Sequence, residues 1–194
     1  GLTQVLGDQM ARHYVLLDAC VAAAHFAPVT TQSANLRTRA STLLTGSAPG
    51  TDVRFLIPNF CIAEVFAVFE KYRWGKTWNK HVKVALTPAK FEKARAAFGA
   101  AIHNGSTILQ VELDRYHILC VDLISPVNNA YKIKRDRSKK RNVTPAKAYD
   151  MLLVAMGIWL QHQYGSESFT LITGDERLAA VVERAKSAKL GRPI

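Results

Sequence analysis

The chain has 194 residues, of which 48% are hydrophobic and 21% are charged, and we expect a single domain over residues 1–194. No apolar run approaches the roughly 20 residues that a bilayer-spanning helix needs, so we expect no association with membranes. The 26 basic and 15 acidic residues give a formal charge of +11, which favours a polyanionic partner.

The first half of the chain alternates short apolar runs with helical patterns. Residues 14–17 form a continuous apolar run, which predicts a buried parallel strand. A polar segment over residues 29–44 has a helical pattern. Residues 55–57 predict a second strand, and Asn59 can cap the helix that follows it.

The middle of the chain continues this alternation. A helix is predicted over residues 88–103, and a strand over residues 107–113. Asp114 can cap the next helix, which we expect to end near Leu123.

A strongly basic segment follows, with seven basic residues and one acid between positions 132 and 141. It lacks apolar periodicity, so we predict an exposed loop whose cations neutralise the phosphates of a nucleic acid. The alternative is a solvated segment without a ligand. The basic residues are Lys132, Lys134, Arg135, Arg137, Lys139, Lys140 and Arg141.

The last part of the chain predicts a helix, a strand and a final helix. Thr144 and Pro145 suit the start of a helix that runs to about Tyr164. Residues 169–173 predict the last strand, and residues 176–186 the last helix. Strands that alternate with helices predict an α/β fold with a central parallel sheet and helices on both faces.

The three cysteines Cys20, Cys61 and Cys120 are widely spaced and lie among apolar neighbours. This pattern fits reduced, buried thiols better than a disulfide framework or a zinc site. We therefore expect a cytoplasmic protein, because reduced thiols are typical of that compartment.

Four acidic residues are predicted to meet at the carboxyl edge of the sheet. Asp18 and Asp175 directly follow predicted strands. Glu64 and Asp150 lie in helices that begin near the same edge. Singly, each has an ordinary explanation: Asp175 as a helix cap and Glu64 as a solvated charge. Asp150 is harder to explain in this way, because Asp is a poor helix former and its neighbours are apolar.

Gathering these carboxylates has an electrostatic cost. At about 5 Å and an effective dielectric constant near 20, each pair repels by roughly 3 kcal/mol. A hard divalent cation with oxygen ligands removes this repulsion. The four acids therefore predict a site for Mg²⁺ or Mn²⁺.

The same residues resemble a known family, the PIN-domain nucleases, and are most similar to the VapC-type toxins of toxin–antitoxin pairs. The matching blocks, in chain order, are Leu16-Leu17-Asp18, Pro58 with Glu64, Ala148-Tyr149-Asp150-Met151-Leu152-Leu153-Val154-Ala155, and Thr173-Gly174-Asp175-Glu176-Arg177-Leu178. The resemblance covers residues 13–186, and the last two blocks are the most specific.

The resemblance implies a three-layer PIN-like fold and a metal-dependent endoribonuclease that hydrolyses RNA phosphodiester bonds with Mg²⁺ or Mn²⁺. Asp18, Glu64, Asp150 and Asp175 would be its catalytic, metal-binding acids, and Thr173 a supporting hydroxyl. A cognate antitoxin protein and homodimerisation are also implied. Glu176 would be either an additional ligand or a solvent-facing charge at a helix start.

The chain departs from the family pattern in two respects. Ala19 and Cys20 follow the first Asp, where family members often have a small polar residue and Asn. This substitution puts the hydrogen bonding around Asp18 in question. Extra sequence around residues 29–53 and 70–105 makes the chain long for a small toxin, so we expect insertions there.

Two further roles are expected within the nuclease hypothesis. Asp150, among apolar neighbours, is expected to accept a proton during hydrolysis. Trp74 and Trp78, interleaved with basic residues, could stack on unpaired bases, and packing in the core or against a partner is the alternative.

Three other functions compete with that of a toxin. The first is an inactive PIN-fold module for RNA binding or assembly, against which the uncompensated repulsion of four acids argues. The second is a PIN nuclease of RNA processing. The third is a phosphotransfer receiver or a phosphatase, and the absence of Asp-x-Asp-x-Thr after the first strand disfavours the phosphatase.

Overall fold

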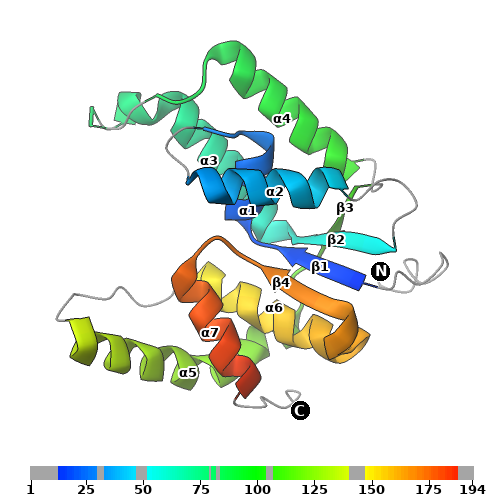
Figure 1. The fold of residues 1–194 in the computed structure, drawn as a ribbon, viewed down its shortest axis with the longest axis vertical. Coiled ribbons are helices and arrows are strands. Elements are labelled where there is room, and N and C mark those ends of the chain that lie inside the picture. Colours follow the sequence, from blue (N-terminus) through cyan, green and yellow to red (C-terminus); the bar gives the residue numbers. More distant parts are fainter. Residues whose placement is uncertain are drawn as a thin grey trace.

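A four-stranded parallel sheet forms the centre of the computed structural model, with the strand order β3-β2-β1-β4 (Figure 1). The strands are β1 (His13–Leu17), β2 (Val53–Pro58), β3 (Ile108–Val111) and β4 (Phe169–Ile172). In the central pairings, Val15 of β1 lies opposite Phe55 of β2 and Thr170 of β4. The structure describes residues 13–29, 33–46, 52–78, 80–81, 84–103, 107–139 and 147–187.

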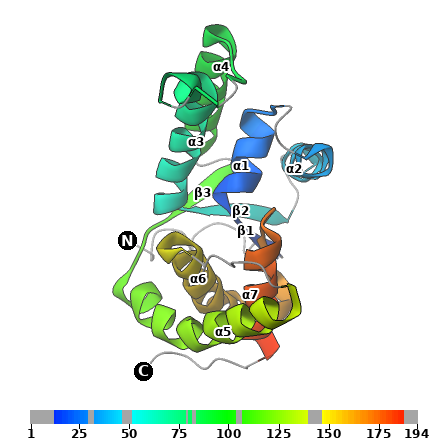
Figure 2. The ribbon, with the colours of Figure 1, turned by 90° about the vertical axis from the view of Figure 1, so that its left-hand side faces the viewer.

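Helices cover both faces of the sheet, which confirms the predicted three-layer α/β architecture (Figures 1 and 2). One layer contains α1 (Ala19–Phe26), α2 (Ala34–Gly46), α3 (Asn59–Trp78) and α4 (Pro88–His103). The other contains α5 (Arg115–Lys139), α6 (Ala148–Tyr164) and α7 (Glu176–Ser187), and a short 3-10 turn (Ser166–Ser168) precedes β4. Among the described helices, none is both long and apolar enough to cross a bilayer.

Burial on both faces explains why the strands read as continuous apolar runs. Leu16 and Leu17 of β1 and Ile57 of β2 are completely buried. Each such side chain contributes about 1.5–3 kcal/mol through removal of its surface from water. On either side, Phe69 of α3 and Met156 of α6 belong to the same core.

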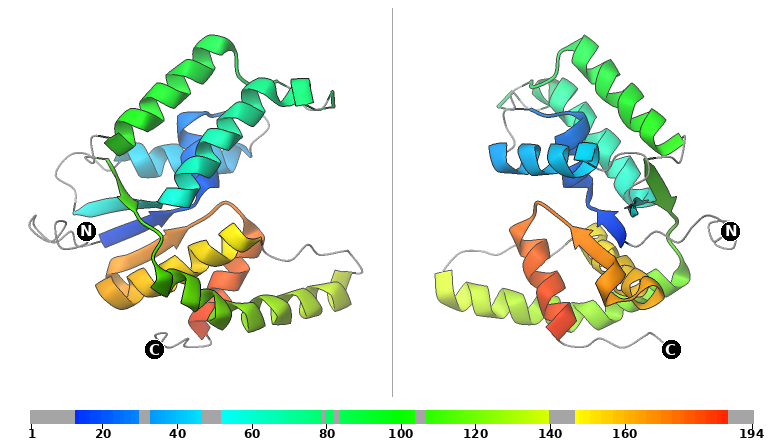
Figure 3. Two further views of the ribbon diagram at one scale, coloured as in Figure 1. Left: turned by 180° about the vertical axis from the view of Figure 1, so that it is seen from behind. Right: turned by 45° about the vertical axis from the view of Figure 1, so that its right-hand side comes forward.

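The strand order reverses beside β1, and this reversal positions the candidate site. The chain passes from β1 to β2 and β3 in one direction, and β4 then returns to the other side of β1 (Figure 3). The N–H of Asp18 donates to the carbonyl of Ile172 across this junction at 3.1 Å. In open parallel sheets, ligands bind at the carboxyl edge where such a reversal occurs.

The prediction that α5 ends near Leu123 and is followed by a basic loop was wrong. The helix continues through Pro126 to Lys139, so residues 132–139 are helical, whereas Lys140 and Arg141 lie outside the described residues. Pro126 removes one backbone donor, but α5 packs along α6 and α7, and this packing outweighs the lost bond. The C-terminal part of α5 extends past α7 (Figure 3).

The predicted start of α6 also needs correction. Thr144 and Pro145 lie outside the described residues, and α6 itself begins only at Ala148, with Lys147 as its N-cap. Asp150 is therefore the third residue of the helix. Its Oδ2 accepts the Lys147 N–H at 2.8 Å, which explains an Asp in this helix because the first turn has unpaired donors.

The buried His117 of α5 makes the stability of this layer depend on pH. Its Nδ1 accepts the N–H of Asp114 at 2.8 Å, and its ring packs edge-on against Trp159 of α6. Burial lowers the pKa of His117, while the charge of Asp114 offsets part of this effect. The folded state therefore binds a proton less readily than the unfolded state.

We expect the free energy of unfolding to fall as the pH decreases through about 6.5, the ordinary His pKa, because protons then bind preferentially to the unfolded chain. Urea unfolding between pH 8 and 5 measures this slope. His117→Gln retains an acceptor and should flatten the slope. Equal slopes for the wild type and the variant would contradict this role of His117.

Candidate functional site

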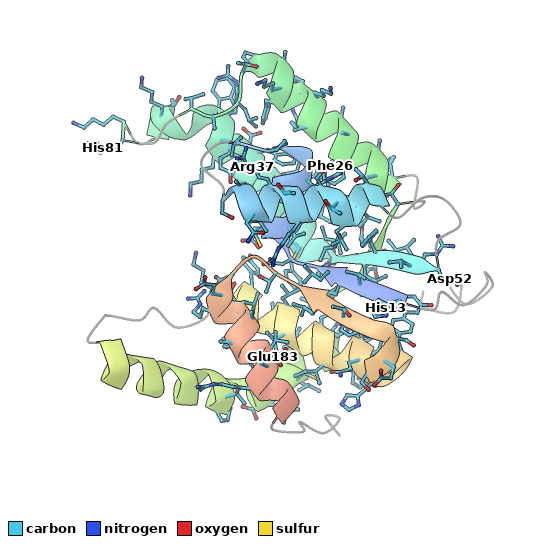
Figure 4. The ribbon with its side chains drawn as sticks, in the orientation of Figure 1. His13, Phe26, Arg37, Asp52, His81 and Glu183 are labelled. Atoms are coloured by element: carbon cyan, nitrogen blue, oxygen red, sulfur yellow. The ribbon has the colours of Figure 1, made fainter. Side chains whose placement is uncertain are left out.

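The four predicted acids come from four segments that converge on the carboxyl edge of the sheet. Asp18 follows β1, Glu64 lies in the second turn of α3, Asp150 in the first turn of α6, and Asp175 directly before α7. The starts of α6 and α7 lie on the same side of the molecule (Figure 1). His13 marks the opposite edge, where β1 begins (Figure 4).

Asp18 is the N-cap residue of α1, but its carboxylate is held by other side chains. It is buried, with 9% of its surface exposed, and its carboxylate makes no capping bond to α1. Its Oδ2 accepts the hydroxyl of Thr173 at 2.6 Å and the thiol of Cys20 at 2.9 Å. Two donors on one oxygen fix the orientation of the carboxylate, and Oδ1 accepts no hydrogen bond from the described residues.

Cys20 supplies the hydrogen bond that the departure from the family pattern put in question. Burial, followed by the charge of Asp18 and the hydrogen bond to it, raises the pKa of this thiol, which therefore stays protonated and can donate. Its Sγ also accepts the N–H of Gly174 at 3.1 Å. Cys61 and Cys120 are buried in the core, as expected, whereas Cys20 is only partly buried.

Gly174 permits the close approach of α2 to this loop. A Cβ at this position would lie 2.8 Å from Leu36 Cδ1 and 3.3 Å from Cys20 Sγ. A larger residue would therefore force either the end of the Leu36 side chain or the loop between β4 and α7 to shift. A shift of the loop would also move the hydroxyl of Thr173.

Asp175 uses one oxygen as the N-cap of α7. Its Oδ1 accepts the N–H of Arg177 at 2.8 Å and that of Leu178 at 3.3 Å. Its own N–H donates to Thr173 Oγ1 at 3.0 Å, which joins the last acid to Asp18 through one hydroxyl. Oδ1 of Asp175 thus has the helix-capping role that is common for an Asp after a strand, whereas Oδ2 faces Arg177.

Arg177 links Asp150 to Asp175. Its Nη2 donates to Asp150 Oδ2 at 2.7 Å and lies 3.5 Å from Asp175 Oδ2. The side chains of Arg177 and Asp150 are 19% and 23% exposed, so water screens this pair less than a surface pair. One guanidinium therefore offsets part of the negative charge of two of the four acids.

Glu64 experiences the charge of the remaining cluster. Partial burial raises its pKa most, the charges of Asp18 and Asp150 raise it further, and the ammonium of Lys147 opposes them. Beneath it, the same negative field contributes to raising the pKa of the buried Cys61 thiol, after the larger effect of burial. Glu64 is thus within electrostatic range of both Asp18 and Asp150.

The donor chemistry of these acids fits a hard divalent cation, because their ligand atoms are carboxylate oxygens and negative charge accumulates around Glu64. Their arrangement is less complete. Within the described ranges, no group of three or more His, Cys, Asp or Glu side chains is placed to hold a metal ion. The pairing of Asp150 and Asp175 with Arg177 accounts for part of this difference.

The tryptophan-containing end of α3 lies away from the acids. Trp74 is 41% exposed, and the guanidinium of Arg73 lies over its ring at 4.0 Å. Ten residues separate Trp74 from Glu64, which is about 15 Å along a helix. The ring is therefore available for stacking, at a distance of a few nucleotides from the acids. Trp78 is the last residue of α3.

A cavity of about 540 Å³ lies between α6, β4 and α7, and its walls contain none of the four acids. Ile158, Leu171 and Val182 are among its lining residues, together with His162 and Gln161. It is separate from the carboxyl edge, and we assign no ligand to it.

The sequence matches no protein-family model and no curated protein. The contacts at the carboxyl edge and the resemblance of the acidic blocks are therefore the observations that bear on the function.

Two contributors to this cluster were not singled out from the sequence. Arg177 lies within the last matching block, and its place two positions after Asp175 in the sequence was the available signal. Lys147 acts on Glu64 by charge, and nothing in its sequence context indicated this.

Glu64→Gln tests whether the acids repel one another in the folded protein. We expect the variant to be more stable than the wild type in a chelator at pH 7, by less than about 1 kcal/mol, because solvent screens an exposed group. Urea unfolding measures the difference. Glu112→Gln, at an exposed acid after β3, is the matched control and should leave the stability unchanged. A less stable Glu64→Gln protein would contradict mutual repulsion.

Proposed function

We propose that the protein is a metal-dependent endoribonuclease that uses Mg²⁺ or Mn²⁺. The observation that supports this most is the convergence of four acids from four separate segments on the reversal of the strand order. Two hydrogen-bonded links, through Thr173 and through Arg177, connect three of these acids, and Glu64 is coupled to Asp18 and Asp150 by charge. Acids with a purely structural role would have no reason to be placed where they repel one another.

Within this proposal, the residues that would hold the cation are Asp18, Glu64, Asp150 and Asp175. A bound divalent cation supplies positive charge for the phosphate and makes water more acidic. Thr173 and Cys20 keep the Asp18 carboxylate in one orientation, so that its Oδ1 would be held in place for the cation. Asp150 offers Oδ1, because its Oδ2 already accepts from Arg177 and from the Lys147 N–H. Its expected role as proton acceptor stays a prediction.

RNA binding is assigned to the basic residues of the chain, whose formal charge is +11. Residues 132–139 form the last turns of α5, on the side of the molecule where α6 and α7 begin (Figures 1 and 3). A strand of RNA that reaches the acids would pass near this helix. The exposed ring of Trp74 offers a second contact for an unpaired base.

The resemblance to VapC-type toxins supports a narrower proposal. The chain would be the toxin of a toxin–antitoxin pair, acting in the cytoplasm as a homodimer, and the antitoxin would cover the acids. A nuclease of RNA processing would need the same four acids.

One observation favours a second candidate function, an inactive RNA-binding or assembly module. Arg177 offsets part of the charge of Asp150 and Asp175 within the chain, so the acids do not depend entirely on a metal for counter-charge. Such a module would bind RNA with a strong salt dependence and would cleave nothing.

Cleavage assays test the proposal directly. Single-stranded and structured RNA is incubated with the protein in Mg²⁺, Mn²⁺ or a chelator. We expect cleavage only with a divalent cation, and a loss of at least about 100-fold in Asp18→Asn and in Glu64→Gln, because each removes a ligand. Asp122→Asn, at an exposed acid of α5, is the control and should retain full activity.

Cleavage that persists in chelator, or that is equal in the acid variants and the wild type, would exclude the metal-dependent mechanism. Salt-sensitive binding of RNA without cleavage under any condition would favour the module.

The salt dependence of RNA binding tests the role of α5. In chelator, log Kd plotted against log salt should have a slope about 1.4 smaller for Lys132→Gln/Lys134→Gln than for the wild type, because two phosphate contacts are lost from single-stranded RNA. Fluorescence anisotropy measures it. Lys90→Gln/Lys93→Gln on α4 removes the same charge at exposed positions elsewhere. Equal slopes for the two double variants would show that α5 makes no special contribution.

A further inference from the structure

The guanidinium of Arg177 occupies the space between two acids of the candidate site. Nη2 lies 2.7 Å from Asp150 Oδ2 and 3.5 Å from Asp175 Oδ2, and the Arg177 side chain is only 19% exposed. A charge-assisted hydrogen bond of this length is stronger than a neutral one, and limited exposure to water reduces its screening.

The backbone fixes where this guanidinium can lie. Arg177 is in the first turn of α7, and its N–H donates to Asp175 Oδ1 at 2.8 Å. Asp175 and Arg177 thus both belong to the start of α7. The Arg177 side chain extends from there to Asp150 on α6. The pair therefore also ties α6 to α7 at the carboxyl edge.

A divalent cation bound by Asp150 and Asp175 would share their carboxylates with Arg177, whose guanidinium faces one oxygen of each. Two cations held by the same carboxylates repel each other strongly at such distances. The remaining partners of the cluster, Asp18 and Glu64, have no comparable contact with Arg177 among the interactions that the structure gives.

We propose that Arg177 is a resident counter-cation that sets the affinity of the site for divalent metal, by competing with it for Asp150 and Asp175. This inference depends on the metal-dependent function proposed above. Metal binding then weakens the Arg177–Asp150 pair, and a guanidinium displaced from it lies beside the acids, where a phosphate of the substrate can bind it. Arg177 is thus a positioning residue that acts through the two acids.

Mn²⁺ binding in the absence of RNA tests this proposal, by isothermal titration calorimetry of the wild type, Arg177→Gln, Arg177→Lys and Arg95→Gln. Arg177→Gln should bind Mn²⁺ about tenfold more tightly, because the competitor is removed. It should also be less stable in chelator and gain more thermal stability from Mn²⁺ than the wild type does. Arg177→Lys should lie between the two.

Arg95→Gln is the matched control, because Arg95 forms an exposed pair with Glu92 on α4, and its Mn²⁺ affinity should equal that of the wild type. Equal or weaker affinity in Arg177→Gln would overturn the inference. If Arg177→Gln does not fold, the affinity of Arg177→Lys decides, since a single ammonium competes less well for two carboxylates.

The two proposals fail in different ways. Metal-dependent cleavage together with unchanged Mn²⁺ affinity in the Arg177 variants would overturn the role of Arg177 alone. An absence of Mn²⁺ binding in all four proteins, together with an absence of metal-dependent cleavage, would overturn both.

Discussion

Repulsion between carboxylates at one edge of the sheet is the constraint around which this structure is arranged. The strand-order reversal brings Asp18 and the loop before Asp175 together, and the helix starts add Glu64 and Asp150. Nothing in a parallel sheet requires acids at this position. The chain offsets their charge with donors, namely a hydroxyl, a thiol, backbone N–H groups and one guanidinium.

The core beneath the edge makes this arrangement rigid enough to hold like charges together. Leu16, Leu17 and Ile57 are completely buried, so the strands that end at the acids cannot separate without exposing much apolar surface. The helix starts are fixed by capping, which Asp150 and Asp175 themselves provide with one oxygen each. Two acids therefore have a structural use, and their substitution is expected to lower the stability of the protein in addition to any effect on the proposed reaction.

The sequence was sufficient for the succession of strands and helices along the chain and for the sheet edge that Asp18 and Asp175 follow, because buried parallel strands appear as continuous apolar runs. It was insufficient for α5, since a basic, non-periodic segment does not show that packing elsewhere along the helix extends it past Pro126. It also missed Arg177, whose partner Asp150 is 27 residues away and is brought near only by the packing of α6 against α7. Cys20 was taken for a packing residue, because a thiol rarely replaces an amide as a donor.

The bond between Thr173 and Asp18 spans 155 positions of the chain, nearly its whole length. A local loop motif can form while a protein is still being synthesised, but no short segment of this chain contains the whole cluster. Asp18 gains its hydrogen bond to Thr173 only after β4 has paired with β1, and such long-range parallel pairing is a slow, late event in folding. The cluster is therefore assembled only when nearly all of the described chain has left the ribosome, and the proposed activity would be absent from the nascent chain.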